Sequence, residues 1–100
     1  MLIIAGTITI DPAQRELAAS AANQMMEDTL KEPGCAAYTI SGDLSDHGSL
    51  HLFEEWQDQA ALDANFATPH MATFQDAIGK IGVRSMSVSK YEVSSKGPLR

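Results

Sequence analysis

Three polar residues between positions 50 and 74 are the main candidates for chemistry: Glu54, Asn65 and His70. A neutral imidazole at His70 takes or gives a proton near neutral pH. The Glu54 carboxyl shares a strand face with apolar neighbours, and burial of this kind disfavours the charged form and raises the pKa. Asn65 offers an amide that can orient a ligand oxygen. Together these residues predict acid–base catalysis, provided that they converge on one cavity.

Each candidate also has an ordinary structural explanation. His70 fits a half-buried histidine with a satisfied partner, which is common in proteins. Glu54 fits a strand-end carboxylate that accepts backbone or interface hydrogen bonds, and Asn65 fits a helix C-cap. The aromatic residues of the region fit core packing first and a ligand wall second; they are Tyr38, Trp56, Phe66 and Phe74.

Composition and motifs argue against several other classes of function. The chain of 100 residues has a formal net charge of −6, and its seven Lys and Arg are scattered, which argues against a nucleic-acid partner. The single Cys35 excludes an internal disulfide framework and a thiolate metal cluster. We predict no metal, because His47 and His51 straddle a loop and a strand rather than one helix face. No Gly-rich phosphate loop supports a nucleotide or flavin cofactor.

The N-terminal run MLIIAGTITI is short, lacks a basic leader and is followed at once by Asp11-Pro12. It therefore predicts a strand rather than a signal peptide or a membrane span. We expect a cytoplasmic protein without a membrane partner.

Strands and helices that position the candidates follow from the apolar periodicity. Alternating or β-branched runs predict strands at residues 2–10, 35–41, 49–56 and 83–93. An amphipathic pattern predicts a helix from about residue 12 to residue 31, after a cap at Asp11 and before the stop Glu32-Pro33-Gly34. Its inward arc is expected to contain Leu17, Ala18, Ala21, Ala22, Met25 and Thr29.

Two further helices carry two of the candidate residues. Asp58 is expected to cap a short helix that ends near Asn65. Thr68 and Pro69 start another helix that runs to about residue 80, with His70 and Phe74 on its inward stripe.

This order of elements predicts an α+β fold of the ferredoxin-like type. A βαββαβ chain with right-handed crossovers gives an antiparallel four-stranded sheet with its helices on one face. Residues 1–94 are expected to form a single domain, and residues 95–100 a C-terminal tail. Because the first strand is apolar on both faces, the uncovered face predicts a homodimer through sheet-to-sheet packing.

Four short motifs resemble those of the antibiotic biosynthesis monooxygenase (ABM) family, which includes small quinol monooxygenases. They are Glu32-Pro33-Gly34-Cys35 with Tyr38, Phe53-Glu54-x-Trp56, Ala61-Leu62, and Thr68-Pro69-His70 with Phe74. The resemblance covers about residues 2–93. The E-P-G-C and E-x-W motifs at this spacing are fairly specific for the superfamily and say much less about the substrate.

The resemblance implies a dimeric α/β barrel with a pocket between each sheet and its helices. It also implies a monooxygenase that uses no metal and no organic cofactor and oxidises a small aromatic phenol or quinol with dioxygen. In that reading His70 accepts the proton, while Asn65 and Glu54 orient the substrate. Trp56 and Phe74 shape the pocket wall, together with Tyr38 and Phe66.

Departures from the family pattern keep other functions open. Many relatives have His where this chain has Asn65, which favours a non-catalytic ligand-binding or stress-response dimer as the alternative. An isomerase or lyase on the same fold would also need only an acid–base pair. The haem-degrading branch is disfavoured, because its expected Asn, Trp and His correspond here to Thr7, Asn65 and Gln75.

Overall fold

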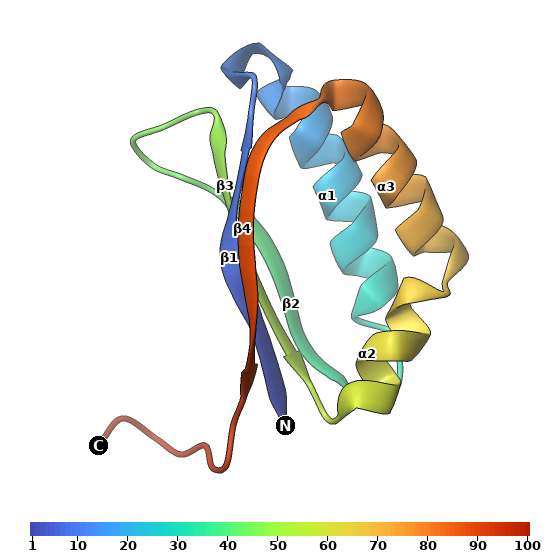
Figure 1. Cartoon of the computed structure of the whole chain (residues 1–100), viewed down its shortest axis with the longest axis vertical. Coiled ribbons are helices and arrows are strands. Elements are labelled where there is room, and N and C mark those ends of the chain that lie inside the picture. The colour runs from blue at the N-terminus through green and yellow to red at the C-terminus, as the bar shows by residue number, and fades with distance from the viewer.

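The computed structural model describes residues 1–100 as one four-stranded antiparallel sheet covered by helices on one face (Figure 1). The strands are β1 (Leu2–Ile10), β2 (Cys35–Gly42), β3 (Ser49–Trp56) and β4 (Val83–Glu92), in the spatial order β2-β3-β1-β4. The helices are a short 3-10 turn η1 (Pro12–Gln14), then α1 (Arg15–Thr29), α2 (Gln59–Phe66) and α3 (Pro69–Ile81). This is the predicted ferredoxin-like α+β fold.

The three capping residues expected from the sequence start their helices. The Asp11 carboxylate accepts a hydrogen bond from the backbone N–H of Ala13 at 3.0 Å. Asp58 does the same for Ala61 at 2.9 Å, and the Thr68 hydroxyl accepts from the backbone N–H of Met71 at 3.2 Å. Because side-chain oxygens satisfy N–H groups that have no partner inside the helix, they fix where each helix begins.

The first helix differs from its prediction at its start and in the environment of one side chain. Residues 12–14 form the 3-10 turn, and the regular helix begins at Arg15. Its buried residues are Ala18, Ala22, Met25 and Thr29, which recur at the spacing of one helix face. Leu17 lies about 100° around the helix from Ala18 and is 62% exposed, so its predicted place on the inward arc is wrong.

The apolar core lies between the helices and one face of the sheet. Trp56, Ile10 and Met25 are almost fully buried there, and the partly buried Ile4, Leu52 and Phe74 pack against the same cluster. Helix α3 packs on α1, and Figure 1 shows the two helices side by side over the sheet. The edge strand β4 is exposed along nearly its whole length, which leaves room between α3 and that edge.

The other face of the sheet has no covering layer in the single chain (Figure 1). Phe53 on β3 is 44% exposed and Tyr91 on β4 is 54% exposed. Beyond β4 the C-terminal segment leads away from the body, although the Lys96 ammonium lies 3.3 Å from a Glu55 carboxylate oxygen. The chain forms no helix with the length and apolar character needed to span a membrane.

Candidate active site

A cavity of about 430 Å³ lies between the sheet and α3, and most of its lining residues are hydrophobic. Residues of all four strands form one side, and residues of α3 together with Phe66 of α2 form the other. The exposed residues of the lining mark its mouth, beside the edge strand β4: Phe66, Gln75, Gly79 and Met86. The buried residues mark its floor: Ile8, Tyr38, Glu54, Met71 and Ile78. This volume and apolar character suit a small aromatic ligand.

Two polar groups stand on that apolar floor, the Glu54 carboxyl and the Tyr38 hydroxyl. Both residues are buried, with relative exposures of 6% and 4%, and they lie side by side as register partners on β3 and β2. One Glu54 oxygen accepts a hydrogen bond from the Trp56 indole N–H at 2.7 Å. The Trp56 bond is the only side-chain hydrogen bond that Glu54 makes, the Tyr38 hydroxyl makes none, and both residues line the cavity.

The Glu54 carboxyl binds its proton more tightly than an ordinary glutamate. Burial raises its pKa, because the charged form loses hydration in the apolar site, and the negative charge of Glu32 raises it further. The hydrogen bond from Trp56 acts in the opposite direction, because it stabilises the carboxylate. Burial is the largest of the three influences. A carboxyl of this kind suits proton transfer closer to neutral pH.

Tyr38 keeps its proton over the whole physiological range. Burial is the main reason that its pKa lies above the ordinary value, and the negative charge of Glu54 adds to the effect. A phenol that stays neutral is a hydrogen-bond donor rather than a second anion. The nearby Cys35 thiol behaves in the same way, since burial and the charge of Glu32 raise its pKa to about 11, so it is not an activated thiolate.

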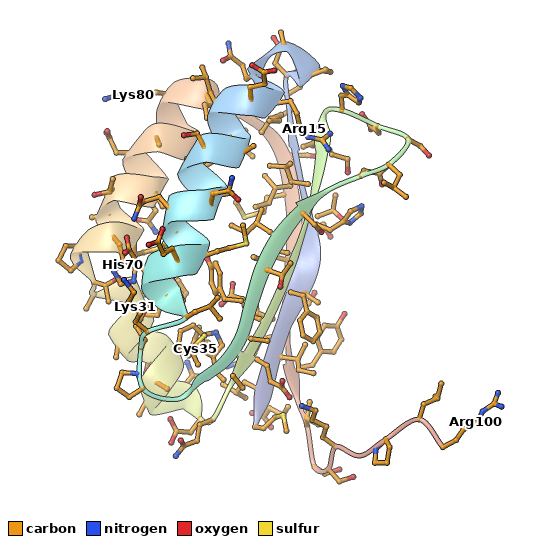
Figure 2. The ribbon with its side chains drawn as sticks, turned by 180° about the vertical axis from the view of Figure 1, so that it is seen from behind. Arg15, Lys31, Cys35, His70, Lys80 and Arg100 are labelled. Atoms are coloured by element: carbon orange, nitrogen blue, oxygen red, sulfur yellow. The ribbon has the colours of Figure 1, made fainter.

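A second polar cluster lies at the end of α1 and gathers around Glu32. One carboxylate oxygen of Glu32 lies 2.7 Å from the His70 ring nitrogen Nε2 and 2.7 Å from the Asn65 side-chain nitrogen. The side chains of His70 and Glu32 are 21% and 12% exposed. His70 therefore sits beside the last residues of α1, close to Lys31 in Figure 2.

Asn65 is completely buried at the end of α2. Its amide donates to Glu32, while its side-chain oxygen has no partner. The opposite amide orientation would place an oxygen against the Glu32 carboxylate. The charge of Glu32 therefore explains why the nitrogen points toward it, even though the oxygen then remains unsatisfied.

The residues selected from the sequence thus lie in two neighbouring environments. Glu54, Tyr38, Phe66 and Phe74 line the cavity, whereas Asn65 and His70 meet at Glu32. His70 instead lines a smaller hollow of about 140 Å³ between α1 and α3, which shares only Phe74 with the cavity. Trp56 has no exposed surface and contacts the site through Glu54.

Sequence reasoning missed two residues of the site. Glu32 was interpreted only as part of a helix stop and a family motif, although an acidic residue in such a motif is itself a possible partner for His70. Met71, buried on the cavity floor, was absent from the predicted stripe of α3.

No group of three or more His, Cys, Asp or Glu side chains is arranged to hold a metal ion.

Comparison with known proteins gives the chain a family. The model of the family described as "Antibiotic biosynthesis monooxygenase" matches residues 1–77. An uncharacterized Synechocystis protein, sll1783, is 27% identical over 98 residues, covering 98% of this chain and 67% of its own length. A Mycobacterium tuberculosis protein named "Putative monooxygenase Rv0793" is 28% identical, covering 78% of this chain and 76% of its own length.

Solved structures show the same fold along nearly the whole chain. A Deinococcus radiodurans crystal structure, described as a "putative antibiotic biosynthesis monooxygenase", superposes with a TM-score of 0.90 and 24% identity. The match covers 100% of this chain and 99% of the other. The structure of Rv0793 superposes with a TM-score of 0.85 over 97% of this chain and 98% of its own, at 22% identity. With the family model matching more than half of its residues, the chain belongs to the antibiotic biosynthesis monooxygenase family.

Proposed function

We propose that the protein is a monooxygenase that oxidises a small aromatic phenol or quinol with dioxygen and needs no cofactor. The observation that carries the proposal is the apolar cavity of about 430 Å³, whose floor includes the polar side chains of Glu54 and Tyr38. An aromatic ring matches the apolar walls, and its hydroxyl group matches the two polar groups.

In this proposal the ionised Glu54 accepts the proton of the bound hydroxyl. The transfer moves a negative charge from the carboxylate to the ligand and adds none, so the buried site is spared a second charge. The neutral Tyr38 hydroxyl and the newly protonated Glu54 then both donate hydrogen bonds to the phenolate oxygen. Donors fixed in place before the reaction stabilise such an anion without reorganisation.

The reaction balances with dioxygen as the only oxidant. The phenolate gives one electron to dioxygen, and the resulting radicals form a carbon–oxygen bond, so that the ring carries a peroxide. Glu54 returns its proton to the peroxide, and loss of water leaves a carbonyl at that ring carbon. For a quinol, the product is a hydroxyquinone. One oxygen atom enters the product, the other leaves in water, and the quinol supplies all four electrons.

We do not assign His70 the role of proton acceptor, although its place on the inward stripe of α3 predicts that role. Its Nε2 atom lies 2.7 Å from Glu32, and its ring borders the α1–α3 hollow rather than the cavity. Proton acceptance by Glu54 is therefore better supported than acceptance by His70, because an acceptor must lie within hydrogen-bond reach of the proton.

We also propose that two copies of the chain pack sheet to sheet. The uncovered face of the sheet carries Ile3 and Ala5 on β1 beside the exposed Phe53 and Tyr91. An apolar face of this kind is a characteristic dimer surface. We expect the dimer in the cytoplasm, where its single cysteine stays reduced.

Oxygen uptake with a panel of quinols and polycyclic phenols tests the proposed activity, with the autoxidation rate of each compound subtracted. We expect Glu54→Gln to lower the rate at least about 100-fold, since general-base catalysis contributes about 10² to 10⁴. Glu16→Gln, an exposed change in the first turn of α1, is the matched control. No uptake above background across the panel would refute the proposed reaction.

A non-catalytic ligand-binding dimer is the second candidate function. The observation in its favour is that the only imidazole near the cavity is engaged by Glu32 and does not line the cavity. That function predicts phenol binding without oxygen consumption, and a Glu54→Gln variant that alters only affinity.

A further inference from the structure

The smaller hollow, of about 140 Å³, lies between α1 and α3, which run side by side over the sheet (Figure 1). Its four apolar lining residues come from both helices: Ala21, Met25, Phe74 and Ala77. Met25 is buried, with a relative exposure of 1%, whereas Gln24 and Thr73 in the same lining are exposed. The α1–α3 hollow therefore leads from the surface of the helix pair to a buried methionine.

The polar side chains of this lining are engaged within the chain. The Gln24 amide nitrogen donates to the Asp28 carboxylate at 3.0 Å, and the Thr73 hydroxyl donates to a backbone carbonyl one turn earlier in α3 at 3.1 Å. The His70 ring nitrogen Nε2 lies 2.7 Å from Glu32. An ordered water needs about two to four polar partners, whereas apolar cavities of about 150 Å³ hold xenon or benzene. The hollow therefore favours a small apolar occupant.

Phe74 is the one residue that lines both the hollow and the larger cavity. It is partly buried and packs against the apolar core. A single aromatic side chain thus forms the wall between the two spaces. Because side chains in a packed interior still change rotamer, such a wall admits a molecule of two atoms more readily than an aromatic ligand.

The position of the cavity mouth explains why a second entrance is useful. The mouth lies beside the edge strand β4, where Gln75 and Met86 are exposed. An aromatic ligand that enters there and reaches Glu54 fills the mouth, so a second reactant needs another way in. The hollow reaches the same cavity from the α1 side of α3, through Phe74.

We propose that the α1–α3 hollow is the entry and holding site for dioxygen, which passes Phe74 to reach the ligand in the cavity. Dioxygen is small, uncharged and apolar, so it matches the size and the lining of the hollow. The inference rests on the proposed function only in making dioxygen the second reactant.

Paramagnetic relaxation by dissolved dioxygen tests the site in the ligand-free protein, without turnover. Methyl NMR relaxation is measured under pressurised dioxygen, with nitrogen at the same pressure as the reference. We expect the Met25 methyl group to relax several-fold faster under dioxygen than the Ala18 methyl group. Ala18 is the matched reference, because it is equally buried on α1 and lines no hollow. Equal enhancement at the two methyl groups would overturn the proposal.

A variant that fills the hollow tests the route. Ala21→Leu adds bulk from α1 and leaves the cavity lining unchanged, since Ala21 is not part of it. It should abolish the enhancement at Met25 and lower kcat/KM for dioxygen several-fold, while kcat/KM for the quinol stays unchanged. A structural defect would lower both values together.

Ala19→Leu, on the exposed side of α1, is the matched control and should change neither value. If Ala21→Leu does not fold, Ala77→Leu fills the same hollow from α3 and takes its place. A kcat/KM for dioxygen that the filled variant shares with Ala19→Leu would overturn the entry role.

The two measurements separate this inference from the proposed reaction. A protein that consumes no oxygen, yet shows the enhancement at Met25 and loses it in Ala21→Leu, retains the dioxygen site and loses the monooxygenase assignment. A protein that consumes oxygen, and whose Met25 and Ala18 methyl groups relax alike under dioxygen, retains the activity and loses the site.

Discussion

Two neighbours act in opposite directions on the proton affinity of Glu54. The Trp56 indole donates to the carboxylate at 2.7 Å and lowers the pKa, whereas the charge of Glu32 raises it. Both act on a group whose burial already raises the pKa. Changes at these neighbours should therefore move the pH dependence of the site without touching the ligand.

Replacement of the indole donor gives the first prediction at this scale. Trp56→Phe keeps an aromatic ring in the core but removes the hydrogen bond to the Glu54 carboxylate, so the pKa of Glu54 should rise further. If the ionised Glu54 is the proton acceptor, the acid limb of the pH–rate profile for oxygen uptake should shift to higher pH. Tyr91→Phe, which removes a hydroxyl from the exposed face, is the control. A limb that stays in place or moves to lower pH would contradict this view of the Glu54–Trp56 pair.

Asn65 provides a second prediction, about stability. Asn65→Asp keeps the shape but places a carboxyl group beside Glu32 in a fully buried site. The cost should be about 3 kcal/mol near neutral pH, the size expected for an uncompensated buried charge. Because burial beside Glu32 should raise the new group's pKa above its unfolded value of about 3.9, the loss should be small at acid pH and grow as the pH rises through the folded value.

Urea unfolding of Asn65→Asp at several pH values measures this dependence. Asn23→Asp, on the exposed side of α1, is the control and should change stability little. A loss of stability that is the same at pH 4 and pH 7 would mean that repulsion by Glu32 is not its cause.

Among the elements, the contact between β1 and β4 determines the sheet side of the cavity. Gly6 on β1 lies so near β4 that a Cβ atom there would stand 2.1 Å from the Ser87 carbonyl oxygen and 2.5 Å from the Val88 Cα. Those atoms are backbone and cannot turn aside. The glycine is thus required for the two strands to approach as they do.

Two Gly→Ala changes should accordingly have opposite effects on stability. Gly6→Ala forces β1 and β4 apart and should cost about 1–3 kcal/mol, as overpacking does. Gly79→Ala in α3 meets nothing within 4 Å and should stabilise the helix by about 0.5–1 kcal/mol. Thermal unfolding of both variants checks the prediction, and an unchanged melting temperature for Gly6→Ala would contradict the described packing.

The elements themselves were largely predictable, because each depends on local pattern. A run of β-branched residues predicted β1 and alternation predicted β3, each with the bounds that it has, and Asp58 and Thr68 predicted the starts of α2 and α3. The 3-10 turn before Arg15 depends on how the chain leaves β1, which the periodicity of α1 does not report. Leu17 was misplaced for a different reason, because the predicted inward arc was too wide and Leu17 lies about 100° from the buried Ala18.

The site was less predictable, because its contacts cross long stretches of chain. Glu32 meets Asn65 and His70 across 33 and 38 residues. The helical spacing correctly predicted that His70 points inward. It does not tell whether the imidazole ring enters the cavity or the adjacent hollow between α1 and α3. Glu54 was identified from its place on a buried strand face, which is a local feature, and it does line the cavity.

For the whole molecule, the uncovered sheet face is the feature that a single chain leaves unexplained. If two copies pack through it, Phe53→Glu should place a charge in the interface and yield a monomer, detectable by sedimentation velocity. Leu17→Glu, at an apolar and more exposed position on α1, should leave the assembly unchanged. A wild-type protein that sediments as a monomer at all accessible concentrations would refute the dimer.

The fate of dioxygen tests the central claim of a cofactor-independent monooxygenase most directly. A quinol that the protein consumes should be oxidised under ¹⁸O₂ in metal-free buffer, and the product should be analysed by mass spectrometry, with exchange of carbonyl oxygen with water measured in parallel. The cavity, Glu54 and Tyr38 predict a hydroxyquinone that contains one ¹⁸O atom, at one dioxygen per quinol, and predict its loss in Glu54→Gln. A simple quinone without ¹⁸O, formed together with hydrogen peroxide, would contradict the account.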